Sequence, residues 1–192
     1  MFQRLRSHIE AITPISDSEF ARLTAHFQRR TLKRKEHFYR QGAVCRAVGF
    51  INKGCMRNYH LEEDGEEYIV NFAFEEWWVA DLQSFYLEIP SMFNVQALED
   101  CELLVSSKRE FETAVARIAP FGEFYRAKIS RAYTTSTLNI VFERSETAEE
   151  RYNKLLARTP WIVDRIPQRY LASYLGIKPQ SLSRIRKKNR RP

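Results

Sequence analysis

Polar and apolar residues alternate with a helical period at the start of the chain. Between residues 2 and 27 the apolar side chains recur every three or four positions, which places them on one face of a helix. The segment 16–19 (Ser-Asp-Ser-Glu) is a helix start signal between two such groups. The pattern therefore predicts two short helices, whose apolar positions are Phe2, Leu5 and Ile9, then Phe20, Leu23 and Phe27.

From Thr31 to about Lys108 the apolar residues recur at a shorter period. Turn signals recur there at 41–42 (Gln-Gly), 53–54 (Lys-Gly) and 64–65 (Asp-Gly). The Asp-Gly pair is a good hairpin signal, because both residues tolerate a positive φ. Several short antiparallel strands at this spacing predict a β-barrel or jelly roll. The strand candidates are Ala47–Ile51, Cys55–Leu61, Glu67–Phe74, Asn94–Leu98 and Glu102–Ser106.

A helical pattern returns from Arg109 to Phe142, interrupted by Pro120. Downstream of that proline, residues at spacings of three and four form one stripe, which is either a dimer seam or a face that packs on the chain's own barrel. A further helix begins at a capping box formed by Thr147 and Glu150, and stops before Pro160. The stripe consists of Phe121, Tyr125, Ile129, Ala132, Ser136 and Ile140.

The segment 168–185 (QRYLASYLGIKPQSLSRI) has the residue types of a helix-turn-helix. Ala172 stands where the first helix must approach the second closely, and Gly176 stands at the turn, where glycine adopts a positive φ most easily. Pro179 falls in the first turn of the second helix, where its missing N–H costs nothing. The residues that fill the wedge between the two helices are Leu171, Leu175, Ile177, Leu182 and Ile185.

The outward positions of the second helix suit a reader of DNA bases. Gln bonds adenine and Arg bonds guanine bidentately in the major groove, so Gln180 and Arg184 are the predicted base readers, with Pro179 beside them. Other residues would meet phosphates, which position the helix and make affinity fall with salt. These phosphate candidates are Arg169, Lys178, Ser181, Lys187, Lys188, Arg190 and Arg191.

Charge is divided unevenly along the chain. Residues 151–192 hold 12 Lys and Arg against one acid, a net charge of +11, whereas the other 150 residues carry −4. This is the layout of a nucleic-acid reader attached to another domain. Three widely spaced cysteines indicate buried reduced thiols in a reducing compartment. No apolar run is long enough to span a membrane and no signal peptide is apparent, so we expect a cytoplasmic protein.

In its order of parts the chain resembles the Crp/Fnr superfamily of bacterial transcription regulators. Residues 32–42 and 48–54 are similar to the opening strands of that family's cyclic-nucleotide-binding-like roll, and Gly176 to Arg184 matches its recognition segment, of which Arg184 keeps the usual residue. The resemblance implies an α+β fold with flanking helices. It implies an effector domain (1–108), a connecting dimerisation helix (109–143) and a helix-turn-helix domain (144–192).

The sensor half departs from the nucleotide-binding members, which carry a Gly-Glu pair and a later Arg that neutralises the cyclic phosphate. Here Ala80-Asp81 and Ser91-Met92 stand at those positions, so we expect no ordinary cyclic AMP response. The oxygen-sensing branch needs an N-terminal cysteine cluster, which is lacking. A lone Cys55 and His60 do not suffice for haem, and no cofactor is expected. An aromatic-rich rim is either barrel core or a pocket for an unknown small-molecule effector, whose candidates are Trp78, Ala80, Asp81, Ser91, Met92 and Phe93.

The sequence therefore predicts a homodimeric transcriptional regulator that binds a pseudo-palindromic site on double-stranded DNA, with RNA polymerase as a further partner. The resemblance also predicts that a full β-wing is missing, and that the tail 187–191 supplies backbone contacts in its place. The alternative is a ligand- or partner-binding module with weak or nonspecific DNA binding. No Ser/His/Asp, Cys/His or metal-spaced set converges, so we expect no enzyme.

Overall fold

The computed structural model describes the backbone of residues 2–189 and the side chains of residues 2–136 and 146–188. Two short helices, α1 (Gln3–Glu10) and α2 (Asp17–Thr24), open the chain as predicted, and Ser16 and Glu19 cap α2 reciprocally. Antiparallel strands follow and form two four-stranded sheets, so the centre of the fold is an antiparallel β-sandwich. The strands are β1 (Gln28–Leu32), β2 (His37–Tyr39), β3 (Ala47–Lys53), β4 (Met56–Leu61), β5 (Glu67–Ala73), β6 (Trp78–Val79), β7 (Asn94–Ala97) and β8 (Cys101–Ser107).

The first sheet has the order β1-β8-β3-β6 and the second the order β2-β7-β4-β5. The predicted hairpin over Asp64-Gly65 is confirmed: β4 pairs with β5, with Leu61 opposite Glu67 and Met56 opposite Ala73. Five strands thus lie where the alternating pattern predicts them. The pattern missed β1, β2 and β6, because the last two have three and two residues, too few to display a period.

The space between the sheets is filled by aliphatic side chains from both, including Ile51, Met56 and Leu103, each without exposed surface. The three cysteines, Cys45, Cys55 and Cys101, are all buried and free, as predicted. Burial raises the pKa of the Cys101 thiol to about 11 and raises that of Cys55 further, so both thiols are protonated and poorly reactive at neutral pH.

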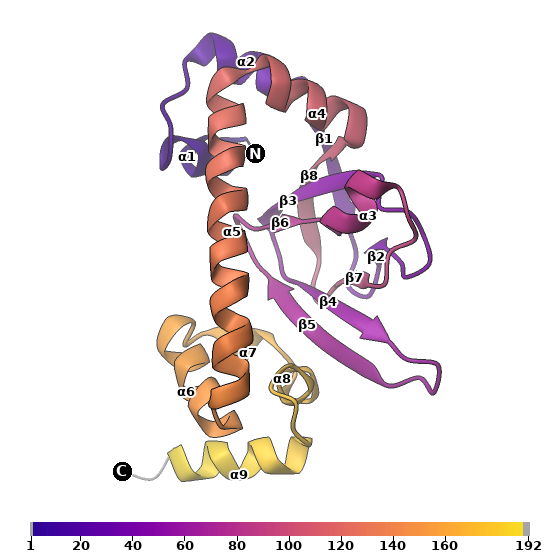
Figure 1. Ribbon diagram of the computed structural model, residues 1–192, viewed down its shortest axis with the longest axis vertical. Coiled ribbons are helices and arrows are strands. Elements are labelled where there is room, and N and C mark those ends of the chain that lie inside the picture. The colour runs from indigo at the N-terminus through magenta and orange to yellow at the C-terminus, as the bar shows by residue number, and fades with distance from the viewer. Residues whose placement is uncertain (1, 190–192) are drawn as a thin grey trace.

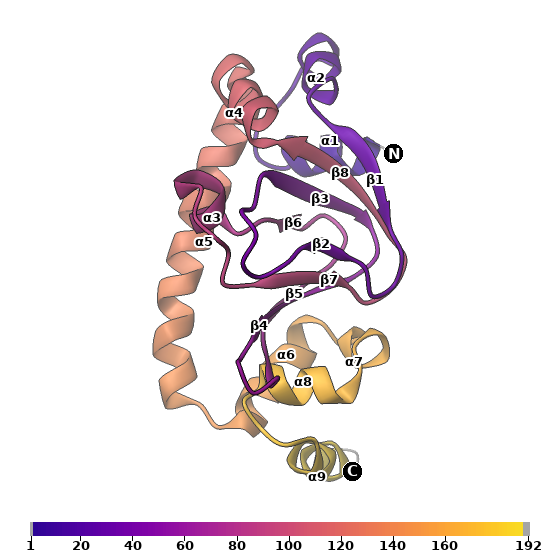
Figure 2. The same ribbon diagram turned by 90° about the vertical axis from the view of Figure 1, so that its right-hand side faces the viewer.

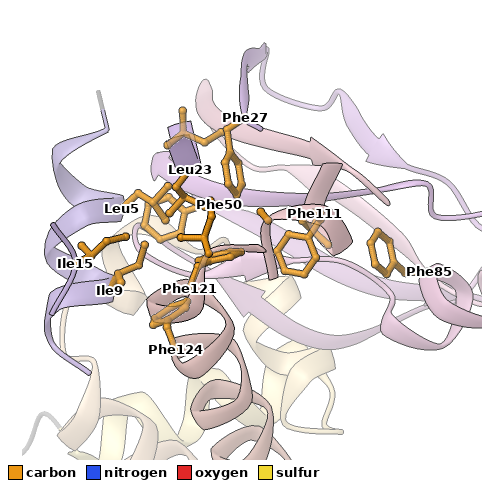
Figure 3. Close-up of a cluster of buried hydrophobic side chains, with 14 of the residues drawn as sticks. Leu5, Ile9, Ile15, Leu23, Phe27, Phe50, Phe85, Phe111, Phe121 and Phe124 are labelled. Atoms are coloured by element: carbon orange, nitrogen blue, oxygen red, sulfur yellow. The ribbon is translucent and has the colours of Figure 1, made fainter. Parts of the chain in front are cut away.

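Helices α1, α2, α4 (Lys108–Arg117) and α5 (Ala119–Ser145) cover one side of the sandwich (Figure 1). The helical region is divided into two helices close to the predicted interruption at Pro120, but the break falls at Ile118, whose backbone is extended, and Pro120 lies in the first turn of α5. Gly122 lets the two pack closely, since a Cβ there would lie 2.6 Å from the Val115 carbonyl oxygen. Phe121 and Phe124 point from α5 into a cluster of aromatic and aliphatic side chains (Figure 3).

The last four helices gather at the other end of α5, below the second sheet (Figure 2). They are α6 (Ala148–Arg158), α7 (Ile162–Arg165), α8 (Gln168–Tyr174) and α9 (Pro179–Asn189), and the predicted capping box of Thr147 and Glu150 opens α6. Between residues 108 and 189 the described backbone contains no strand. Within the described residues, no helix combines the length and the apolar character that crossing a membrane requires. The predicted domain limits at 108 and 143 stay predictions.

Candidate nucleic-acid interface and effector cavity

The turn between α8 and α9 is built from backbone hydrogen bonds. The amide of Gly176 donates to the Ser173 carbonyl and that of Ile177 to the Ala172 carbonyl, each at 3.0 Å. This pair of bonds is a Schellman cap, which needs a left-handed residue at its centre, and Gly176 has a φ of +67°. From α6, the Arg151 guanidinium donates to the Leu175 carbonyl at 2.8 Å, so the turn is held from a third helix. The predicted role of Gly176 is confirmed.

The two helices pack through the predicted apolar residues. Leu182 of α9 has no exposed surface, and it joins a cluster that contains Leu171, Ala172 and Leu175. At the start of α8, the Gln168 amide donates to the Pro179 carbonyl at 3.2 Å and to the Ser183 hydroxyl. Burial of one face of α9 fixes which residues its other face presents to solvent.

The outward face of α9 carries the predicted base readers. Pro179, Gln180 and Arg184 are exposed, and among the described residues Gln180 and Arg184 form no ion pair or side-chain hydrogen bond. Their polar groups are therefore available to a ligand. Helix α9 lies at the end of the molecule farthest from α2 (Figure 2).

The phosphate candidates divide into three groups. Lys178 and Lys187 are exposed, and Ser181 is half-buried. Two others already have partners: Lys188 pairs with Glu149 at 2.8 Å, and Arg169 stacks on the Tyr170 ring and donates to its hydroxyl. Arg190 and Arg191 lie outside the described residues.

The C-terminal helices are docked on the edge of the second sheet, a contact that sequence reasoning missed. Ser173 of α8 donates to the Glu67 carbonyl at 2.8 Å and accepts from the Ile69 amide at 3.1 Å, so α8 is bonded to the β5 backbone. Aromatic rings join the two parts at Phe72 with Tyr174 and at Phe74 with Trp161. The partners in each of these contacts are about a hundred positions apart in the sequence, so no local sequence pattern predicts that they pair.

A second attachment is ionic. Arg165 of α7 forms a bidentate pair with Glu75 at 2.9 and 3.0 Å and a further bond with Glu99, and it stacks over Phe74 and Trp161. Burial alone would raise the pKa of the Glu75 carboxyl, but hydrogen bonds from Arg165 and the Gly54 amide outweigh it and lower that pKa to about 2. The carboxylate is therefore strongly favoured in the docked arrangement.

Acid is expected to weaken this attachment. The folded pKa of Glu75 lies below its ordinary value of 4.5, so the stabilisation is complete above about pH 4.5 and disappears as the pH falls toward 2. The two side chains keep 26% of their surface exposed, so the contribution is on the order of 2 kcal/mol. Trp161 fluorescence during acid titration should show a transition that the Glu75→Gln variant lacks. Identical titrations of the two proteins would contradict the assignment.

A small cavity of about 70 Å³ opens within the β-sandwich. Of the predicted effector-pocket residues, Trp78 and Ala80 line it, together with Arg57, Asn58 and others from β4, β5 and β7. The other candidates, Asp81, Ser91, Met92 and Phe93, do not line this cavity, and the predicted effector pocket stays a prediction. Ser91 donates to Asp81 at 2.7 Å, and Met92 is 61% exposed.

Comparison with known proteins shows which domain and which folds the chain is similar to. Residues 29–117 match the cyclic nucleotide-binding domain. No curated protein sequence matches the chain. Among solved structures, FixK2 from Bradyrhizobium japonicum has 16% identity, covering 84% of this chain and 83% of its own, with a TM-score of 0.71. The c-di-GMP responsive global regulator CLP of Xanthomonas campestris has 17% identity, covering 91% of each chain, with a TM-score of 0.67.

The chain thus has the fold of these two proteins, and the match to the sensor domain of the transcriptional regulator DNR from Pseudomonas aeruginosa agrees. That match covers 72% of this chain and 90% of the sensor domain at 22% identity, with a TM-score of 0.58. The predicted resemblance to Crp/Fnr regulators is therefore supported at the level of the fold. The DNA-binding role of α8 and α9 stays a prediction.

Within the region that matches the cyclic nucleotide-binding domain, Asp81 stabilises the local structure. Its side chain caps the short helix α3 (Leu82–Leu87) by accepting from the Ser84 amide at 3.1 Å, and its other oxygen accepts from Ser91. The two segments predicted to replace a phosphate site do lie together, but their polar groups satisfy one another. At about 70 Å³ the cavity is also far smaller than the roughly 300–1,000 Å³ of ordinary ligand pockets.

The residues of the predicted dimer stripe become more exposed along α5. Phe121 is buried in the protein's own core and Tyr125 is half-buried against Phe111, so the first turns pack on the sandwich. This corrects the assignment of Phe121 to a seam. Ile129 is half-buried, and Ala132 and Ser136 are exposed. The Ile140 side chain lies outside the described residues.

Proposed function

We propose that the protein is a homodimeric regulator of transcription that binds a specific site on double-stranded DNA through α9. The observation that carries this proposal is the exposure of Gln180 and Arg184 on a helix whose opposite face is buried through Leu182. An α-helix fits the major groove, and these two side-chain types discriminate adenine and guanine there. In this reading α8 crosses the DNA backbone.

The charge of residues 151–192 supports the same proposal. A net charge of +11 in 42 residues destabilises a folded segment by self-repulsion unless an anion is its partner. The ion pair of Lys188 with Glu149 and that of Lys154 with Glu146 neutralise only part of it. DNA phosphates would neutralise Lys178, Lys187 and their neighbours, and the release of counterions makes binding depend on salt.

Selection of binding sites from a random-sequence DNA pool, at two salt concentrations and without added ligand, tests the proposal. We expect an enriched inverted repeat whose half-sites lie about 10 base pairs apart, since each protomer places one helix in the groove. Binding without an enriched motif, equally strong for every sequence, would contradict a base-reading role for α9.

Dimerisation is expected to use the exposed part of α5. The whole helix has 27 residues and is about 40 Å long. Ala132 is exposed there, and Tyr133 beside it is 74% exposed, which is unusual for a large aromatic residue. The Ala132→Glu variant should be monomeric, because a charge would be buried at the seam. Size-exclusion chromatography with light scattering measures this. An Arg131→Glu variant on the same helix turn controls for charge, and a monomeric wild type would contradict the dimer.

Cyclic AMP is expected to have no effect. Resemblance implies that nucleotide-binding members neutralise the phosphate with an Arg, and Ser91 stands at that place, paired with the acidic Asp81. The missing charge-assisted bonds would be worth roughly 2–3 kcal/mol. Titration calorimetry with cyclic AMP should therefore give no saturable heat. Saturable binding of cyclic AMP in the micromolar range would show that a group other than an arginine at position 91 binds its phosphate.

A further inference from the structure

Gln168, at the start of α8, bonds directly to α9. Its side-chain Nε2 atom carries two hydrogens, and each has an acceptor on α9: the Pro179 carbonyl oxygen at 3.2 Å and the Ser183 hydroxyl oxygen. Pro179 and Ser183 are four residues apart in the same helix, so they lie one above the other on one face of it. One side chain of α8 therefore holds the first turn of α9 at two points.

These two contacts lie on the flank of α9, between its buried and its outward face. A helix advances about 100° per residue, so Pro179 and Ser183 lie roughly 60° and 100° around the axis from the buried Leu182. The base-reading candidates Gln180 and Arg184 lie about 160° from Leu182, on the opposite face. A rotation of α9 about its axis would therefore move the base-reading side chains and break the bonds to Gln168 at the same time.

The other restraints on α9 are less directional. The apolar contact at Leu182 holds α9 against α8, but apolar contacts favour no single rotation. On the opposite flank Lys188 pairs with Glu149 of α6, and salt screens this largely exposed pair. Side-chain ends lie about 5–6 Å from a helix axis, so a rotation of about 20° moves them by roughly 2 Å. A binding site needs its groups within about 0.5 Å of the productive geometry.

We propose that Gln168 is a positioning residue for base recognition, whose two hydrogen bonds set the rotation of α9 and so the direction of Gln180 and Arg184. This rests on the proposed function, because it concerns the specificity of the same helix. Gln168 uses both amide hydrogens on α9, and its Oε1 atom is an acceptor, as phosphate oxygens are, so the side chain does not suit a phosphate contact. Its loss lowers sequence preference, whereas attraction to phosphates remains.

Gln168→Met tests the proposal, because methionine has a similar length and helix propensity but no hydrogen-bond donor. The preference is measured as the ratio of two affinities, for the selected DNA site and for a site with one recognised base pair changed. We expect this ratio to fall roughly tenfold. Affinity for DNA of random sequence should change by less than about twofold, because all charges are kept. Fluorescence anisotropy at one salt concentration measures both quantities.

Ser183→Ala removes one of the two acceptors and should reproduce part of the loss of preference. The double variant should lose no more preference than Gln168→Met alone, because the two residues act through one bond. Ser181→Ala is the matched control, since it makes the same chemical change on the other flank of α9 at a predicted phosphate contact. It should weaken binding to every sequence by a similar factor and keep the preference.

The position of α9 is measured separately, without DNA, through the Leu182 amide. This amide donates to the Lys178 carbonyl at 3.2 Å in the first turn of α9. Gln168→Met should accelerate its hydrogen exchange roughly tenfold, because the turn loses the two bonds that hold it. Exchange at the Ile69 amide, which donates to Ser173 of α8, should be unchanged, since α8 stays bonded to the sheet.

Equal loss of affinity for all sequences in Gln168→Met would show a phosphate contact and overturn the proposal. An unchanged preference, or additive effects of Gln168→Met and Ser183→Ala, would overturn it as well and leave the proposed function intact. If the wild type selects no DNA motif, the proposed function fails. The Leu182 amide then decides whether Gln168 positions α9: accelerated exchange in Gln168→Met supports this, and unchanged exchange refutes it.

Discussion

Replacement of Arg184 by alanine is expected to lower affinity for the selected DNA site by roughly 10- to 100-fold and to abolish the preference at one base pair of each half-site. Arg184 is exposed on α9, and among the described residues it has no competing ion-pair partner. Its loss therefore removes contacts to DNA and leaves the fold unchanged. Fluorescence anisotropy with the selected site and with single-base variants measures both effects.

Two further variants distinguish base recognition from nonspecific electrostatic attraction to DNA. Arg184→Lys keeps the charge but loses the bidentate geometry, so it should restore salt-dependent binding without restoring the base preference. Arg158→Ala removes the same charge from an exposed position on α6, away from α9. If Arg158→Ala and Arg184→Ala weakened binding equally for all sequences, Arg184 would only contribute to nonspecific attraction.

Features encoded by neighbouring residues were predictable from the sequence. The hairpin at Asp64-Gly65, the capping box at Thr147 and the turn at Gly176 each depend on residues within one or two turns of chain, and all three are confirmed. The same locality explains why α9 begins at Pro179, where a proline needs no hydrogen-bond donor. The local sequence was therefore sufficient to predict the turn and the helix start that position the candidate DNA-reading face.

Contacts between distant segments were not predictable. Arg57 and Arg165 look like solvated charges in the sequence, yet each has its guanidinium stacked on aromatic rings supplied by another part of the chain. Asp81 looked like a charge in a ligand pocket, but it caps α3 and bonds Ser91. The two arginines found these partners only through the fold, whereas the partners of Asp81 lie three and ten residues along the chain. In each case the charge is paired, as the cost of burying an unpaired charge requires.

The docking of the C-terminal helices on the sandwich depends both on local sequence features and on contacts between distant segments. The sandwich binds α7 and α8 along one side. Helix α9 packs on α8 through Leu182 and pairs with α6 through Lys188 and Glu149, and its outward face stays free. A domain attached only by a flexible connector would present that face in many orientations. Attachment through Arg57 and Arg165 reduces that freedom, which would favour the proposed binding to two half-sites at fixed spacing, because less conformational entropy would be lost on binding.

Phe121→Ala is expected to have the largest effect on stability, about 3–5 kcal/mol, because it removes a fully buried ring from a packed core. Phe121 lies among Phe27, Phe111 and Phe124, with ring centres between 5.6 and 6.2 Å away. Urea denaturation followed by circular dichroism, at a fixed protein concentration, measures the change.

The Phe121 variant also distinguishes the two interpretations of the α5 stripe. If the first turns of α5 pack on the protein's own sandwich, Phe121→Ala should lose stability while the surviving folded protein keeps the oligomeric state of the wild type. Tyr133→Ala, on the exposed part of the same helix, should lose little monomer stability and weaken association instead. The reverse outcome, a stable Phe121→Ala monomer, would return Phe121 to the seam and contradict the interpretation that its side chain, which has no exposed surface, only packs in the protein's own core.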